Sequence, residues 1–142
     1  MASYNKFQAF VENLLISNLD FNADTFKVML TLTAPVATNS VKADLTEISA
    51  GNGYTAGGTA TTISHSRSSG TSKITGTDVV FTASGGAIGP FRYAVLYDDT
   101  PTSPADPLIA WWDYGTVGGI TLNSGETFTV DFDATNGIFQ IT

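Results

Sequence analysis

The sequence predicts a mainly β protein, an antiparallel β-sandwich or open barrel of about seven strands with one N-terminal amphipathic helix. Three observations predict this class. Several segments alternate between apolar and polar residues, as half-buried strands do. Turns rich in glycine, proline and asparagine separate these segments. Apolar residues at helical spacing occur near the start of the chain. The length of 142 residues fits a single β-rich domain over 1–142.

The helix is predicted over about 4–17. Asn5, followed three residues later by Gln8, has the spacing of a capping box, and Asn18 and Asp20 suit the end of the helix. A lone helix of this length is marginal in water, so its apolar stripe must pack against the sheet or dock on a neighbouring subunit. The stripe consists of Phe7, Phe10, Val11, Leu14 and Leu15.

The clearest predicted strand spans 26–32, where every even-numbered residue is apolar, so one face should be buried. Pro35 cannot continue a central ladder and ends this region. Segment 91–97 is apolar on both faces, which favours a central strand. Asn136-Gly137, between two strand patterns, predicts a hairpin. The other predicted strands span 79–83, 108–114, 127–133 and 138–141.

The stretch from about 39 to 76 is rich in Gly, Ser and Thr, and we expect an extended excursion from the sheet. Segment 45–48 fits a short strand or a turn, and 59–66 has strand propensity. Segment 51–58 is the densest in glycine. It lacks the Lys-Ser/Thr ending and the following helix of a phosphate cradle, so we expect a tight turn anchored by Tyr54.

Composition excludes several classes of function. Six Lys and Arg stand against 13 Asp and Glu, which gives a net charge of −7. The basic residues form no stripe, so neither nucleic acid nor an anionic membrane is an expected partner. The absence of cysteine excludes disulfides and thiolate metal sites. The apolar run near the start, 14–16, is too short for a signal or a membrane span, and we expect synthesis in a host cytoplasm.

No enzyme is predicted. The single histidine, His65, lies between two serines with no nucleophile motif nearby, so we expect no catalytic residues and no cofactor. Carboxylates cluster at Asp98, Asp99 and Asp106 without an EF-hand register. Turn formation accounts for the first two, and we predict no metal, with a bound Ca²⁺ as an open alternative.

The adjacent pair Trp111 and Trp112 should point to opposite faces of a strand. Trp112 is assigned to the core. Trp111 could lie under the helix, form a platform for a sugar ring or anchor an interface. The candidate interface residues are Tyr4, Phe7, Tyr54 and Trp111.

Taken in order, seven segments resemble a family of small structural proteins of tailed-bacteriophage virions. The glycine-rich segment and the aromatic strand pair are its more specific parts. Within such particles, small acidic β-domains are most similar to capsid decoration, or cement, proteins. The segments are 4–7, 26–35, 43–48, 51–58, 81–97, 107–115 and 125–132.

The resemblance implies a virion component on the capsid surface, with the major capsid protein as partner and a homo-oligomer, a trimer being favoured. It supplies no catalytic residues. We expect a non-enzymatic decoration protein that stabilises the mature head lattice through the N-terminal arm and the 39–76 excursion. Two alternatives remain. One is a phage tail component, such as a fibre tip, a baseplate part or a tail-tube accessory. The other is a carbohydrate-binding module that uses Trp111.

Overall fold

The computed structural model describes residues 2–142 and confirms a mainly β fold with one short N-terminal helix. Its central element is a five-stranded antiparallel sheet. In spatial order, the sheet consists of β1 (Ser3–Lys6), β9 (Leu108–Asp113), β8 (Tyr93–Asp98), β2 (Phe26–Thr31) and β3 (Thr59–Thr61).

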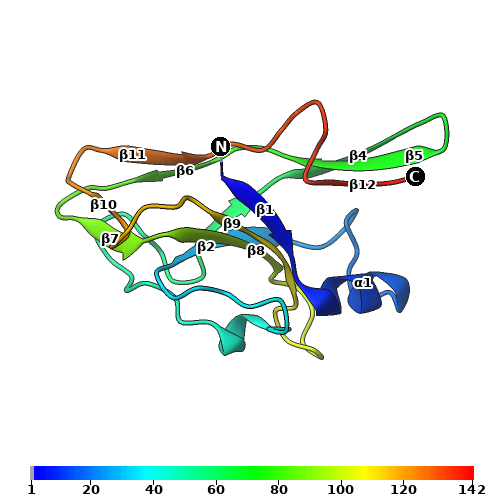
Figure 1. Cartoon of the computed structure of the whole chain (residues 1–142), viewed down its shortest axis with the longest axis horizontal. Coiled ribbons are helices and arrows are strands. Elements are labelled where there is room, and N and C mark those ends of the chain that lie inside the picture. Colours follow the sequence, from blue (N-terminus) through cyan, green and yellow to red (C-terminus); the bar gives the residue numbers. More distant parts are fainter. Residues whose placement is uncertain (1) are drawn as a thin grey trace.

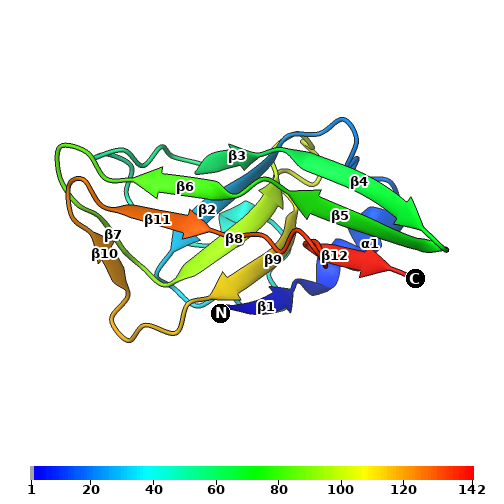
Figure 2. The same ribbon diagram turned by 90° about the horizontal axis from the view of Figure 1, so that it is seen from above.

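A second layer of strands lies over one face of this sheet (Figure 1). It is built from two small antiparallel sheets that follow one another along the layer (Figure 2). One contains β11 (Thr127–Val130) and β6 (Val79–Thr82), and the other contains β12 (Phe139–Ile141), β5 (Thr71–Gly76) and β4 (Ile63–Ser68). At one end of the molecule β10 (Ile120–Leu122) pairs with β7 (Ile88–Phe91).

The main core fills the space between the two layers, so the molecule is a sandwich, and the strands of residues 2–142 form no closed barrel. Alternation produces this core. Val28 and Leu30 of β2 face Phe81 and Val130 of the second layer, and all four side chains are buried.

The opposite face of the five-stranded sheet is covered by chain without strands. Segment 32–50, which includes the 3₁₀ helix η1 (Lys42–Asp44), runs beneath the sheet (Figure 1). Residues 51–54 then reach the end of β6, where the backbone N–H of Ser84 donates to the carbonyl of Asn52. Leu45 of the segment beneath the sheet packs on a small second core. The prediction of one buried face for 26–32 is therefore wrong, because Met29 and Thr31 are also fully buried. The second core consists of Phe7, Met29, Val95, Tyr97 and Leu108.

The N-terminal helix is shorter than predicted. Residues 3–6 form β1, an edge strand paired with β9, and α1 (Gln8–Leu15) begins only after Phe7. The predicted capping box does not form, because Asn5 lies within the strand and the helix start has no side-chain cap. Its C-terminal end lies close to prediction: Ser17 adopts a positive φ, and the backbone N–H of Asn18 donates to the carbonyl of Asn13.

The predicted apolar stripe is only partly buried. Phe10 packs in the main core, but Val11 and Leu15 point to solvent. The polar residue Asn13 takes a buried position instead, where its side-chain oxygen accepts a hydrogen bond from the Asn18 amide at 3.0 Å. A β-strand ahead of the helix changes which residues face the sheet.

Three further predictions are corrected. Residues 2–142 form twelve strands instead of about seven. β1 replaces the start of the expected helix, β10 is not predicted, the 39–76 excursion contributes β3, β4 and β5, and 91–97 is divided at Arg92 between β7 and β8. Gly89-Pro90, one of the glycine- and proline-containing pairs that the sequence predicts to form turns, lies within β7. The turn at Asn136-Gly137 exists, but it joins no hairpin, because β11 pairs with β6 and β12 pairs with β5.

Candidate functional site

Two of the predicted interface residues are interior residues. Phe7 is fully buried in the second core, and Tyr54 is only 2% exposed in the main core. The Tyr54 hydroxyl accepts a hydrogen bond from the backbone of Leu30 at 3.0 Å and donates one to Glu47 at 2.7 Å. Burial raises the pKa of this hydroxyl above its ordinary value. Tyr54 thus anchors the glycine-rich turn, as the sequence predicts. Because its side chain is buried, it offers no surface to a partner.

The two tryptophans lie on opposite faces of β9, as alternation predicts. Trp111 packs against Phe7, with ring centroids 4.5 Å apart, on the face that carries the second core. Trp112 lies on the other face, at the margin of the main core, and is only partly buried. Trp111 is also half-buried, and its side chain mainly packs against the second core.

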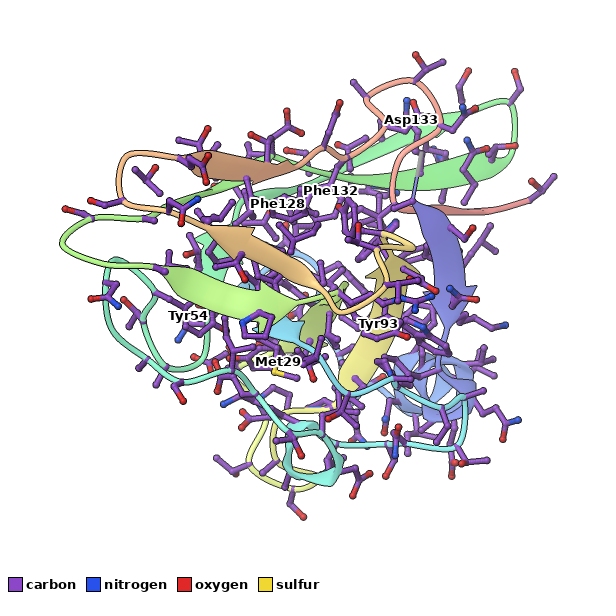
Figure 3. All side chains as sticks on the ribbon, turned by 60° about the vertical axis from the view of Figure 1, so that its left-hand side comes forward. Met29, Tyr54, Tyr93, Phe128, Phe132 and Asp133 are labelled. Carbon is purple, nitrogen blue, oxygen red and sulfur yellow. The ribbon has the colours of Figure 1, made fainter. Side chains whose placement is uncertain are left out.

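A groove of about 770 Å³ opens at the edge of the sandwich, where β1 and β9 face the loop that follows β11. In Figure 3, Phe132 points into the space between the layers and Asp133 lies on that loop. We call this feature the edge groove. It is lined by Ala2, Tyr4, Trp112, Tyr114, Thr129, Asp131, Phe132, Asp133, Ala134, Gly137 and Ile138.

Aromatic rings line the edge groove. Trp112 lies between two other rings, with its centroid 5.7 Å from that of Tyr4 and 5.3 Å from that of Phe132, both in edge-to-face geometry. Phe132 is buried, whereas Tyr4 is 41% exposed on the edge strand. Tyr114 is half-buried and carries its hydroxyl beside the acidic rim. The groove therefore presents a row of rings, two of which, Tyr4 and Trp112, lie on the paired strands β1 and β9.

Two carboxylates of different character lie on the rim. Both oxygens of the Asp133 carboxylate already accept hydrogen bonds within their own turn, from the backbone of Thr135 and from the backbone and side chain of Asn136. These bonds hold the pKa of Asp133 below its usual value. Asp131 is exposed, and no hydrogen bond or ion pair within residues 2–142 engages its carboxylate. Burial, with Asp131 nearby, raises the pKa of Tyr114 to about 12, so its hydroxyl remains protonated.

Sequence reasoning found the parts of the edge groove but not the groove. Tyr4 is a predicted interface residue, and Trp112 is assigned to the core on the face it occupies. No sequence signal shows that the loop after β11 lies across from β1, because that depends on which strands pair. The edge groove thus contains one of the four candidate interface residues, Tyr4.

The three carboxylates that cluster in the sequence, Asp98, Asp99 and Asp106, do not converge on a common site. Asp98 is fully buried, and Asp99 pairs with Lys27 at 2.6 Å. Asp106 lies in the loop before β9, beside a shallow depression formed with Lys42 and Glu47. Across residues 2–142, no three His, Asp or Glu side chains come together as a metal site would need. His65 is an exposed residue of β4.

A second surface feature lies on α1. Val11 and Leu15, one helical turn apart, are exposed, and Leu15 reaches 78%. Ile16, directly after the helix, is 59% exposed. We call these three residues the apolar helix surface.

No helix within the described part of the chain is long and apolar enough to span a membrane.

Comparison of the chain with models of protein families, with curated proteins and with solved structures finds no match.

Proposed function

We propose that this chain is a non-enzymatic structural protein of a tailed bacteriophage, a capsid decoration protein that binds the major capsid protein and stabilises the mature head lattice. The observation that carries the proposal is the apolar helix surface. The resemblance of the sequence segments to small virion proteins supports the same class.

The apolar helix surface is unusual in its setting. Val11 and Leu15 belong to the predicted apolar stripe, yet they are exposed, and Ile16 beside them is exposed as well. An exposed group of branched apolar side chains favours a partner that removes it from water. Full burial of one such side chain is worth about 1.5–3 kcal/mol, so three of them supply a useful contact for each copy.

Unpaired strand edges offer a second kind of contact. β1 and β3 are the two edges of the five-stranded sheet, and β4 is an edge of the second layer. The exposed residues of β4 are mostly hydroxyl-bearing, as in Ser64 and Ser66. Such edges can add a strand from a neighbouring chain through backbone hydrogen bonds. Many modest contacts of this kind, repeated by symmetry, would stabilise the lattice form that they bind.

The test compares two single variants with a matched control. Leu15→Asp and Ile16→Asp place a charge on the apolar helix surface, whereas Val117→Asp places the same charge at a residue 92% exposed on a loop far from α1. The reagent is particles lacking the protein, incubated with each purified chain. We expect the first two variants to remain folded by circular dichroism and to lose at least about tenfold in particle affinity, since a buried unpaired charge is costly.

Val117→Asp should bind as the natural chain does. Equal binding by all three variants would show that the apolar helix surface is not the lattice contact. Binding of the natural chain to tails and not to heads would replace the decoration role with that of a tail component.

A further inference from the structure

We infer that the edge groove is a binding site for a neutral saccharide, with Trp112 and Tyr4 as the packing surface and Asp131 and Tyr114 as the hydrogen-bonding groups. This inference goes beyond the decoration role and does not depend on it, because it concerns a different part of the molecule from the apolar helix surface.

The aromatic row supplies the first argument. A sugar ring has an apolar face made of C–H groups and a rim made of hydroxyls, so it packs its face on an aromatic side chain. The rings of Tyr4 and Trp112 lie 5.7 Å apart at the mouth of the groove, and both are partly accessible. Both come from paired strands, β1 and β9, whose backbone hydrogen bonds fix the ring positions before a ligand arrives.

The polar groups supply the second argument. The Asp131 carboxylate is a strong acceptor with no partner among residues 2–142, and the Tyr114 hydroxyl beside it can both donate and accept. Thr129 adds a second hydroxyl to the lining. Acceptors and hydroxyls around an aromatic surface match the rim of a polyol, whose hydroxyl groups each donate one hydrogen bond and accept others.

Charge decides between ligand classes. The lining contains two carboxylates and no Lys or Arg, so an anionic ligand would be repelled. A cationic ligand gains little, because Asp133 is already committed to its own turn and Asp131 is exposed, where an ion pair contributes at most about 1 kcal/mol. A neutral ligand rich in hydroxyls can donate to the Asp131 carboxylate and leaves the hydrogen bonds of Asp133 intact. The volume of about 770 Å³ is large enough for a short oligosaccharide.

The two tryptophans make the site directly observable. Trp111→Phe leaves Trp112 as the single tryptophan, within the groove, and keeps an aromatic ring against Phe7. Trp112→Phe leaves Trp111, outside the groove, as the matched control. The probes are glucose, galactose, mannose, rhamnose, N-acetylglucosamine and N-acetylgalactosamine, together with maltotriose, cellotriose, lactose and chitotriose. Binding is followed by saturation-transfer NMR and by tryptophan fluorescence.

We expect at least one probe to bind with a dissociation constant on the order of 1 mM, and to change the fluorescence of Trp111→Phe but not that of Trp112→Phe. Asp131→Asn should weaken binding about tenfold, because it replaces a charged acceptor by a neutral amide. Glu12→Gln, the same change of charge at an exposed residue of α1, should leave binding unchanged. Tyr4→Ala should also weaken binding while the fold is retained.

Three results would overturn the inference. In the first, no probe binds at ~10 mM or above. In the second, a probe binds without changing the fluorescence of Trp112, or it binds Asp131→Asn and Glu12→Gln with equal affinity. Either outcome would show that the binding site lies elsewhere. In the third, trilysine binds the groove more tightly than every saccharide, which shows that the carboxylates serve a cationic partner. None of these results depends on the capsid role.

Discussion

The two faces of the five-stranded sheet are covered in different ways. One face packs against a second layer of strands, and nineteen buried residues, from Phe10 to Ile138, form a continuous core there. The other face is covered by the strandless segment 32–57, which we call the cover, and only five buried residues form the core on that face. The cover also reaches the main core through Ile48 and Tyr54. The first interface is held mainly by apolar area, and the second depends to a larger extent on hydrogen bonds to buried side chains.

Glu47 and Tyr97 show how the second face is held. The Tyr97 hydroxyl donates to the carbonyl of Gly57 at 2.7 Å, and Glu47 accepts from the backbone of Gly57 at 2.6 Å and from Tyr54 at 2.7 Å. The Tyr97 bond ties the irregular segment to β8, and the Tyr54 hydroxyl, which accepts from the backbone of Leu30, ties it to β2. A cover without its own periodic structure thus needs specific polar anchors, because it cannot rely on a strand ladder.

The largest expected effect comes from the main core. Phe81→Ala removes a buried ring from β6 that packs near Tyr54, with centroids 5.7 Å apart. We expect a loss of about 3–5 kcal/mol in the free energy of unfolding, measured by urea denaturation. Leu45→Ala, a half-buried residue of the cover, is the comparison and should cost less than half as much. Equal losses would contradict the division between the two faces.

A smaller effect is expected at the polar anchor of the cover. Glu47→Ala leaves the Tyr54 hydroxyl and the Gly57 amide without this acceptor, and should lower the free energy of unfolding by about 2 kcal/mol. Hydrogen exchange should accelerate in residues 45–57 and stay unchanged in β6 and β11, because the cover opens locally. Glu47→Gln, which retains a side-chain oxygen, is the control. Uniform acceleration across both faces would show that Glu47 stabilises the whole molecule instead.

The smallest expected effect depends on pH. Asp98, fully buried at the end of β8, accepts a hydrogen bond from the backbone of Thr100 through Oδ1, while Oδ2 has no hydrogen-bond partner among residues 2–142. Burial, with Asp24 alongside, raises the pKa of Asp98 to about 7. The folded chain therefore holds the proton more tightly than the unfolded chain, and the stability due to this proton is lost as the pH rises from about 4 through 7.

Asn at position 98 imitates the protonated carboxyl, because it carries no charge and its side-chain oxygen can still accept from the backbone of Thr100. We expect Asp98→Asn to be more stable than the natural chain by ~1–2 kcal/mol at pH 8, with the difference shrinking toward pH 4. Thermal unfolding across this range measures it. A difference that is constant with pH would contradict the raised pKa.

The sequence predicts the strand-covered face of the sheet better than the face under the strandless cover. Alternation and short apolar runs identified β2, β6, β9 and β11. Alternation in 127–133 also predicts that Phe128, Val130 and Phe132 face the core, and they do, because a strand layer on one side imposes a period of two. The cover has no period, so the burial of Met29 and Thr31 could not be read from the sequence. Pairing between strands far apart in the sequence, such as β12 with β5, could not be predicted either. Asn136-Gly137 was therefore expected to join a hairpin.

The candidate sites follow the same rule. Alternation separated Trp111 from Trp112 correctly. It could not show that Phe7 would be buried beside Trp111, because β1 replaced the first turn of the expected helix. Nor could it place the loop after β11 opposite Tyr4, which is what creates the edge groove. The exposure of Leu15 was likewise missed, since helical spacing identifies a stripe but not whether all of it is covered.

The most direct test of the proposed function is the copy number of this chain in purified virions, measured by quantitative mass spectrometry against the major capsid protein. A decoration protein repeated over the head lattice should be present in numbers comparable with those of the major capsid protein. A few copies per particle, as for fibre or baseplate parts, would contradict the decoration role and favour a tail component. Absence from the virion would contradict both.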